Sequence, residues 1–287
     1  MSTPQGSNTE RVKEQMRQDW STVVPAWRKW KSQQEAHTHA ATEMIIQTAR
    51  LKPGMRVLDL ASGTGDPALT LAEVVGPSGH VTATDLVPEM LLVAEESARE
   101  RGLTNISFQQ ADAEALPFPD QTFDVVTCRF GVMFFPNVQQ ALQEIRRVLK
   151  AGGRAAFIAW GPGEQNPDHR IPQEILRKYA QIPPAEPGAP NPFKFAQAGA
   201  LSTVMREAGF KRVQEGYRII PRPWPGPAEQ CWEFQKQVRA SLQRSIDRLA
   251  PEKRQQADGK VIAAIRQFYD GQQVNFTAVI VVASGVR

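Results

Sequence analysis

Hydrophobic positions between residues 55 and 160 form short apolar runs that alternate with amphipathic stretches. The apolar runs are typical of buried strands, whereas the stretches between them repeat their apolar positions at the three- and four-residue spacing of helices. The predicted strands cover 55–61, 79–86, 106–112, 123–130 and 152–160, and the predicted helices cover 66–75, 88–102 and 137–150. This alternation predicts an α/β fold, Rossmann-like, with a mostly parallel sheet and helices on both of its faces.

Two further helices are predicted before this alternating region, over 9–31 and 35–50. The apolar side chains of the first helix recur at spacings of three and four, which places them on one face. These residues are Trp20, Val23, Val24, Trp27 and Trp30. The second helix ends before Pro53, because the residue before a proline disfavours helical backbone.

The alternation stops after Trp160. "GPGEQNPDHRIPQ" and "IPPAEPGAPNPF" are rich in Pro and Gly, which predicts loops. A helix over 198–210, strands over 211–220 and 275–285, and two helices between the strands complete the chain. We therefore divide it into an N-terminal helical lid, 1–50, and a main domain, 51–287, with a Pro-rich insert at 161–197 and a helical insert at 222–272. The segments outside the sheet either cover its ligand-binding edge or simply bury hydrophobic surface.

Composition narrows the class of protein. The chain has 287 residues, a net charge of +4 and 41% hydrophobic residues, which is typical of a globular protein. Its basic residues are scattered, whereas nucleic-acid binders usually carry a dense basic stripe. No apolar run is long enough to span a bilayer, and the N-terminus has no apolar signal core. The two cysteines, Cys128 and Cys231, lack metal-site spacing and fit a reducing cytoplasm, so we expect neither a metal nor a disulfide.

The segment "MRVLDLASGTGDPAL", 55–69, reads as strand, tight loop and helix. Its "GTGDPA" fits the G-x-G-x-x-A pattern of dinucleotide-binding loops. Asp85 follows twenty residues after Gly65, at the end of the second predicted strand, where a carboxylate can accept both hydroxyls of an adenosine ribose. Nicotinamide and flavin enzymes share this pattern, so it does not identify the ligand by itself.

Two further acids favour a positively charged ligand. Asp59 precedes Gly63 by four residues, where a carboxylate would repel a pyrophosphate but attract an ammonium group. Asp112 ends the third predicted strand, where its side chain can accept a hydrogen bond from an adenine amino group; the alternative is a turn residue. The three acids together favour an adenosine-containing cation over a dinucleotide.

Five segments, about a third of the chain, occur in an order typical of one family: "VLDLASGTG" (57–65), "TATDL" (82–86), "QADAEALPFPDQTFDVV" (110–126), "RFGVMFFPN" (129–137) and "EIRRVLKAGGR" (144–154). In these segments the chain resembles the class I S-adenosylmethionine-dependent methyltransferases, and most closely the branch that includes the menaquinone and ubiquinone ring C-methyltransferases and many small-molecule methyltransferases. This resemblance implies a seven-stranded sheet whose last strand runs antiparallel, and S-adenosylmethionine as the cofactor.

The resemblance also implies roles for individual residues of this chain. Asp59 would anchor the cofactor's ammonium, Asp85 its ribose and Asp112 its adenine. Ala61 stands where many relatives carry glycine, and an alanine fits there if the backbone avoids positive φ. The other residues implied at the cofactor are Trp20, Gly63, Gly65, Leu86, Met90, Ala113, Cys128 and Arg129.

The cofactor makes the transferred methyl group electrophilic, so the protein mainly has to align the acceptor, and a base helps only if the acceptor must lose a proton. The candidate catalytic residues are His169, near the expected acceptor position, Tyr217 on a late strand, and Arg129, which could bind an acidic group. His37 and His39 are further candidate bases. A structural role remains the alternative for each of these residues.

We expect methyl transfer to a small, hydrophobic or aromatic acceptor, because aromatic residues are frequent outside the predicted sheet. One alternative is ring C-methylation of a quinone precursor. An alternative of another class is an NAD-dependent oxidoreductase, and a third is a cofactor-binding protein without catalysis. We expect no nucleic-acid partner, no stable membrane insertion, a cytoplasmic location and a monomer or homodimer.

Overall fold

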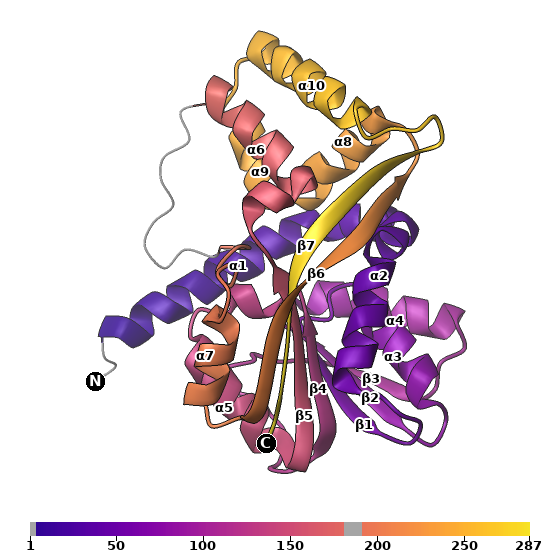
Figure 1. Cartoon of the computed structure of the whole chain (residues 1–287), viewed down its shortest axis with the longest axis vertical. Coiled ribbons are helices and arrows are strands. Elements are labelled where there is room, and N and C mark those ends of the chain that lie inside the picture. Colours follow the sequence, from indigo (N-terminus) through magenta and orange to yellow (C-terminus); the bar gives the residue numbers. More distant parts are fainter. Residues whose placement is uncertain (1–3, 181–190) are drawn as a thin grey trace.

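A computed structural model describes residues 4–180 and 191–287, with side chains from residue 8 onward. Its centre is a seven-stranded sheet with the order β3-β2-β1-β4-β5-β7-β6 (Figure 1). The strands are β1 (Arg56–Leu60), β2 (His80–Asp85), β3 (Ile106–Gln110), β4 (Phe123–Arg129), β5 (Leu149–Trp160), β6 (Lys211–Pro225) and β7 (Gln273–Val286). The first five strands pair in parallel, and β7 pairs antiparallel with both β5 and β6. The predicted fold class and its antiparallel last strand are confirmed.

Helices cover both faces of this sheet. In Figure 1, α2, α3 and α4 lie on one side, and α5 and α7 lie on the other. Their bounds are α2 (Lys31–Ala49), α3 (Ala68–Val75), α4 (Pro88–Glu100), α5 (Val138–Val148) and α7 (Ala200–Glu207). The central strands β1, β4 and β5 are therefore largely buried on both faces, which explains their continuous apolar sequences, whereas the edge strand β3 is partly exposed.

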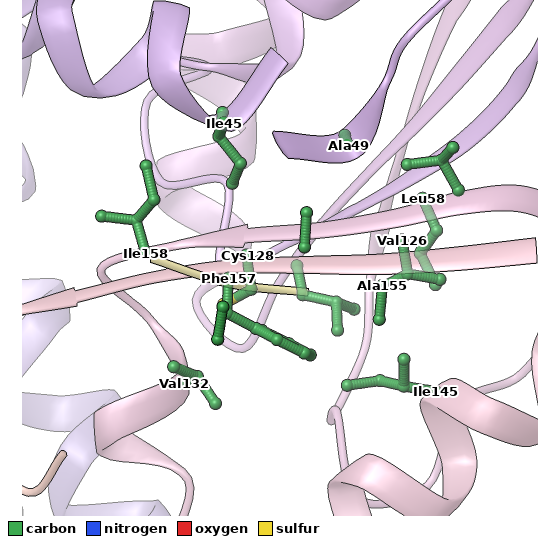
Figure 2. Close-up of a cluster of buried hydrophobic side chains, with 14 of the residues drawn as sticks. Ile45, Ala49, Leu58, Val126, Cys128, Val132, Ile145, Ala155, Phe157 and Ile158 are labelled. Carbon is green, nitrogen blue, oxygen red and sulfur yellow. The ribbon is translucent and has the colours of Figure 1, made fainter. Parts of the chain in front are cut away.

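The main hydrophobic core lies between these layers and the central strands. Figure 2 shows Ile45 and Ala49 of α2 on one side of the strands, and Val132 and Ile145 on the other. Phe157 of β5 is fully buried between them. Burying a side chain of this size stabilises the fold by roughly 1.5–3 kcal/mol. The core thereby fixes the strand ends from which the candidate site is built.

The helix after β1 begins later than predicted. It starts at Ala68, and no side chain caps it. The Asp66 carboxylate, at the predicted first residue of this helix, instead accepts hydrogen bonds from Thr38 and Thr42 of α2. The prediction was wrong because a buried partner on another helix competes for the same carboxylate.

In Figure 1 the long helix α1 (Pro4–Lys29) extends from near the N-terminus toward the middle of the molecule, and it contacts α4. Val23 and Val24, on the predicted apolar face, pack with Val87, Met90 and Val93 of α4 into a small cluster. The helix therefore covers α4 rather than forming an independent bundle with α2.

A second group of helices lies beyond the carboxyl ends of the strands. It comprises α6 (Pro167–Tyr179), α8 (Ala228–Val238), α9 (Ala240–Asp247) and α10 (Pro251–Arg266). Figure 1 shows them beside the upper ends of β6 and β7. Side chains from these helices and strand ends form a separate hydrophobic cluster that contains Trp30, Trp224 and Trp232. We call these four helices the helical cap. No helix among the described residues is long and apolar enough to cross a membrane.

Two sequence expectations need correction here. The segment "NPDHRIPQ" was expected to be a loop, but Pro167 opens α6, where the missing N–H of a proline costs nothing. The helical insert holds three helices instead of two, and it starts later because β6 continues to Pro225. The predicted loop "IPPAEPGAPNPF" lies mostly outside the described residues.

Candidate functional site

The loop after β1 and the end of β2 form the centre of the candidate site. The Asp85 carboxylate accepts hydrogen bonds from the backbone N–H of Gly63 at 2.9 Å and of Val87 at 2.9 Å. Burial raises the pKa of Asp85, and these two N–H groups partly offset the rise. The carboxylate keeps free lone pairs, so it can still accept from two vicinal hydroxyls.

Gly65 lets the loop approach the helix that follows. Its φ is 109°, in the left-handed region that favours glycine. A Cβ at this position would lie 2.9 Å from Leu69 Cδ1 and 3.1 Å from Ala94 Cβ. The glycine therefore serves close packing as well as turn geometry.

Asp59 is fully buried beneath the loop. Its carboxylate accepts hydrogen bonds from Thr127 Oγ1 at 2.6 Å and Ser62 Oγ at 2.8 Å. Burial raises the pKa of Asp59 to about 6, although the two hydroxyls and the nearby Arg129 counteract the rise. Neither hydroxyl was singled out from the sequence, because only the register of β1 against β4 brings Thr127 opposite Asp59.

Ala61 does not meet the condition under which an alanine was expected to fit, because its φ is 54°. Its side chain is instead accommodated by a glycine on the next loop. A Cβ on Gly131 would lie 2.5 Å from the Ala61 Cβ and 2.7 Å from Cys128 Sγ. Burial, together with the Asp59 charge, raises the pKa of the Cys128 thiol, so it stays protonated and serves packing.

Asp112 and Ala113 lie just beyond β3, which ends at Gln110 instead of at Asp112 as predicted, and Asp112 already has a cationic partner. Lys13 of α1 places its Nζ 2.6 Å from Asp112 Oδ2 and 2.8 Å from Glu114 Oε2. Burial alone would lower the pKa of Lys13, but the two carboxylates raise it above its usual value. Lys13 was missed in the sequence because nothing local links it to residues a hundred positions away.

The apolar residues predicted at the cofactor also gather here. Met90 is buried under α1 and Leu86 is half-buried at the end of β2. Trp20 is half-buried, and its ring lies 5.7 Å from Phe134 and 5.8 Å from Trp27, both edge-on. The structure thus brings Trp20 to the loop that follows β4.

The guanidinium group of Arg129 is held by Asp66 and Thr42. Its Nη1 lies 2.6 Å from Asp66 Oδ2 and donates to Thr42 Oγ1 at 2.6 Å, and its Nη2 donates to the Asp66 carbonyl. These contacts tie the end of β4 to α2 and to the loop before α3. A contact between Arg129 and the acceptor stays a prediction.

The other candidate bases occupy different places. Tyr217 lies on the edge strand β6, exposed, and its hydroxyl donates to the Ala196 carbonyl. His39 is exposed beside Glu43. His169 and His37 are both buried, at the junction between the helical cap and the sheet.

These two histidines belong to a buried polar group that the sequence did not reveal, which we call the Asp168 cluster. Asp168 Oδ2 lies 3.4 Å from Arg222 Nη2, 3.2 Å from Arg239 Nη2, and 3.9 Å from Nε2 of both His37 and His169. These residues come from α6, β6, the end of α8 and α2, so only the tertiary structure brings them together.

Burial and the neighbouring charges set the protonation states in this cluster. Burial, with the nearby arginines, lowers the pKa of His37 to about 3 and that of His169 well below 6.5, so both rings are neutral at pH 7. Burial alone would raise the pKa of Asp168, but the arginines hold it far below its usual value. Burial lowers the pKa of Arg222 to about 10, which leaves it cationic.

A surface hollow of about 550 Å³ lies elsewhere, lined by Arg56, His80 and Lys150 among others. These residues begin β1, β2 and β5 or lie beside those starts, at the amino ends of the strands. Ligands of open α/β sheets bind at the carboxyl ends. We therefore assign the candidate site to the opposite edge, where the three acids lie.

The described geometry is that of a Rossmann-like methyltransferase fold, and comparison with known proteins agrees. Residues 33–165 match the model of the "ubiE/COQ5 methyltransferase family". The Ubiquinone/menaquinone biosynthesis C-methyltransferase UbiE of Shewanella pealeana is 40% identical over 136 residues, which are 47% of this chain and 53% of that protein. The chain thus spans about half the length of the curated relatives it matches. The predicted resemblance to class I S-adenosylmethionine-dependent methyltransferases is confirmed.

Solved structures agree at the level of the fold. The YcgJ protein from a Bacillus species superposes with a TM-score of 0.56 at 22% identity, covering 87% of this chain and 98% of that one. The [4+2]-cyclase SpnF superposes with a TM-score of 0.51 at 22% identity, covering 86% of this chain and 79% of that one. A cyclase among these structures means that the fold alone does not decide the chemistry.

Proposed function

We propose that this chain is an S-adenosylmethionine-dependent methyltransferase that acts on a small, hydrophobic or aromatic acceptor. The observation that carries the proposal is the set of three acids, Asp59, Asp85 and Asp112, at the carboxyl ends of adjacent strands around a glycine loop. Such a set suits a ligand with a cationic end and a ribose, and it would repel a pyrophosphate. The family match over residues 33–165 supports the same conclusion.

The described residues fit this cofactor. Asp85 has free acceptor capacity beside the Gly63 N–H, and Asp59 is a buried carboxylate with an unmatched charge that an ammonium group would neutralise. When bound, the cofactor supplies an electrophilic methyl group. The chain's own residues bind and orient the cofactor, and the helical cap excludes water. Good alignment of the acceptor supplies roughly 7–11 kcal/mol of the barrier reduction.

A quinone-precursor acceptor is the alternative that the relatives favour. The matched proteins of Shewanella species are named as ubiquinone/menaquinone biosynthesis C-methyltransferases. The family model, however, ends at residue 165 and leaves out Asp168, His169, Arg222 and Arg239, which are all the members of the Asp168 cluster except His37. We therefore propose that the acceptor is set by the segment outside the match.

Two other classes are less consistent with the site. An NAD-dependent oxidoreductase would place a pyrophosphate close to the buried Asp59 carboxylate. A binding protein without catalysis would need the same cofactor contacts but no acceptor site. We further propose a cytoplasmic monomer or homodimer, with 1–50 as a helical lid on the domain of residues 51–287.

Calorimetric titration with S-adenosylhomocysteine tests the proposal. We expect micromolar binding to the wild-type chain and no binding of NAD. Asp85→Ala should weaken S-adenosylhomocysteine by about 10- to 100-fold, because hydrogen bonds to a charged group contribute roughly 1.5–3 kcal/mol. Asp247→Ala, an exposed aspartate on α9, is the matched control and should leave the affinity unchanged.

Thermal unfolding of Asp85→Ala would show whether the loop still folds, since Gly63 and Val87 lose an acceptor in this variant. An unchanged affinity in a folded variant would remove the ribose assignment. Binding of NAD in place of S-adenosylhomocysteine would overturn the proposed function.

A further inference from the structure

We propose that the Asp168 cluster forms the recognition site for an acidic oxygen, such as a carboxylate, on an aromatic methyl acceptor. This inference rests on the proposed function, because it names the class of acceptor for that reaction. It stands on three observations: an excess of buried positive charge, buried polar atoms without partners, and the position of the cluster beside the cofactor loop.

The charge excess is local and buried. The guanidinium groups of Arg222 and Arg239 face one carboxylate, that of Asp168, and the two histidines are neutral. Arg222 is 4% exposed and Asp168 is 1% exposed, so water screens neither charge well. One net positive charge therefore remains in a desolvated place, which favours an anionic ligand.

The unpartnered atoms point to the same ligand. Arg222 donates from Nε to His37 Nε2 at 3.2 Å and approaches Asp168 through Nη2, but its buried Nη1 has no partner. Asp168 Oδ1 and His169 Nε2 are likewise buried without partners. Buried polar groups normally have hydrogen-bond partners, so three unpartnered atoms in one cluster indicate a binding site for a polar ligand. A carboxylate bound here would satisfy the donor Arg222 Nη1, and a neighbouring hydroxyl on the same ligand could donate to one of the two remaining atoms.

The cluster lies beside the predicted cofactor site through a short series of rings. The Arg222 guanidinium lies over the Trp160 ring at 4.5 Å, and His169 is 4.6 Å from the same ring. Trp160 stacks on Phe130 at 4.0 Å. Phe130 immediately precedes Gly131, which packs against Ala61 of the glycine loop. Two stacked rings, Trp160 and Phe130, thus separate a group bound at Arg222 from the segment that packs against the glycine loop.

The surroundings of the cluster are apolar and aromatic. Phe193 packs edge-on against His169, and His37 packs edge-on against Trp224 and Phe234. Such walls favour the hydrophobic body of an acceptor, while the cluster binds its acidic oxygen. An aromatic acid combines both requirements, whereas a free inorganic anion would not use the walls.

A pair of isosteric probes tests this inference with the full chain. 1-Naphthoate and its neutral amide, 1-naphthamide, are titrated by calorimetry with and without saturating S-adenosylhomocysteine. We expect naphthoate to bind at least about tenfold more tightly than naphthamide, since only the acid carries the charge that Arg222 recognises.

Two variants separate recognition from a purely structural role. Arg222→Met should abolish the preference for naphthoate, whereas Asp168→Asn removes the opposing charge and should strengthen naphthoate binding several-fold. A structural cluster would lower the melting temperature in both variants without these opposite effects. Arg218→Met, an exposed arginine on the same strand, is the control and should change nothing.

The outcomes are distinguishable even if a variant fails to fold, because the comparison of the two probes needs only the wild-type chain. Equal binding of acid and amide, or binding of neither while S-adenosylhomocysteine binds, would overturn the acidic-oxygen site. Ordered water molecules would then be the expected partners of the unpartnered buried atoms. Selective naphthoate binding without any S-adenosylhomocysteine binding would overturn the methyl-transfer proposal but support the anion site.

Discussion

Asp59 has a charge state that the fold controls directly. In the unfolded chain an aspartate titrates near its ordinary pKa, whereas burial raises the pKa of Asp59 to about 6 in the folded protein. A raised pKa of an acid means that the folded state binds the proton more tightly, so Asp59 destabilises the fold as pH rises from about 4 to 6. Binding of an ammonium group requires the opposite, ionised form.

We therefore predict that S-adenosylhomocysteine binds less tightly as pH falls through 6. Between pH 7 and pH 5 the dissociation constant should rise up to about tenfold, since at pH 5 most of Asp59 carries a proton. Calorimetry across this range measures the effect, and Asp59→Asn should bind weakly with little pH dependence. An affinity that stays constant between pH 5 and pH 7 would contradict the assignment of Asp59 to the ammonium.

At the scale of elements, one lysine of α1 forms ion pairs with two carboxylates that lie just beyond β3. Lys13 is 7% exposed and bridges Asp112 and Glu114, while further along α1 Trp20 contacts Phe134. A ligand that forms a hydrogen bond with the Asp112 carboxylate must share it with Lys13. The first half of α1 therefore controls access to the predicted adenine site.

Lys13→Met should loosen this half of α1, because removing one partner leaves two carboxylates without their buried cation. We expect backbone amides of α1 near Lys13 to exchange at least about tenfold faster, and S-adenosylhomocysteine to dissociate faster, as measured by hydrogen exchange and stopped-flow fluorescence. Lys29→Met is the control on the same helix, since Lys29 lies at the surface, where its Nζ donates to Gln237 Oε1 and lies over the Trp30 ring, and it has no contact with Asp112 or Glu114 among the described residues. Unchanged exchange in Lys13→Met would show that α1 is held by its apolar face alone.

The two larger of the three hydrophobic clusters among the described residues lie around the sheet and in the helical cap. Trp232 is 1% exposed in the cap cluster, and its Nε1 donates to Asp258 Oδ1 at 2.7 Å, which joins α8 to α10. Since the two clusters have different members, a defect in one is expected to spare the other.

Trp232→Ala should destabilise the helical cap by about 3–5 kcal/mol, the usual cost of removing a buried tryptophan. Hydrogen exchange should accelerate in α8 and α10 while β1 and β4 keep their protection. Ile219→Ala, at a side chain that is 75% exposed, provides the control. Equal acceleration in the sheet and the cap would mean that the molecule unfolds as a single unit.

The sequence was sufficient to predict most of the strands and helices of the central domain. Short apolar runs predicted β1 to β5, of which β1 and β4 are almost entirely buried whereas the edge strand β3 is partly exposed. The glycine pattern predicted the loop because only small residues tolerate its backbone. The three acids could be placed because each lies at or near the carboxyl end of a strand, and these ends of parallel strands meet at one edge of the sheet. The class of fold and the resemblance to methyltransferases followed from these signals.

Tertiary structure decided the partners of those residues. Thr127 reaches Asp59, Lys13 reaches Asp112, and Arg129 turns to Asp66, each across many positions of the chain. The Asp168 cluster joins α2, α6, β6 and the end of α8, so no local sequence pattern predicts it. Periodicity and spacing report which face a residue occupies, whereas long-range packing and burial fix its neighbours and its charge. That is why the cofactor loop could be located from the sequence, while the candidate acceptor site emerged only from the folded chain.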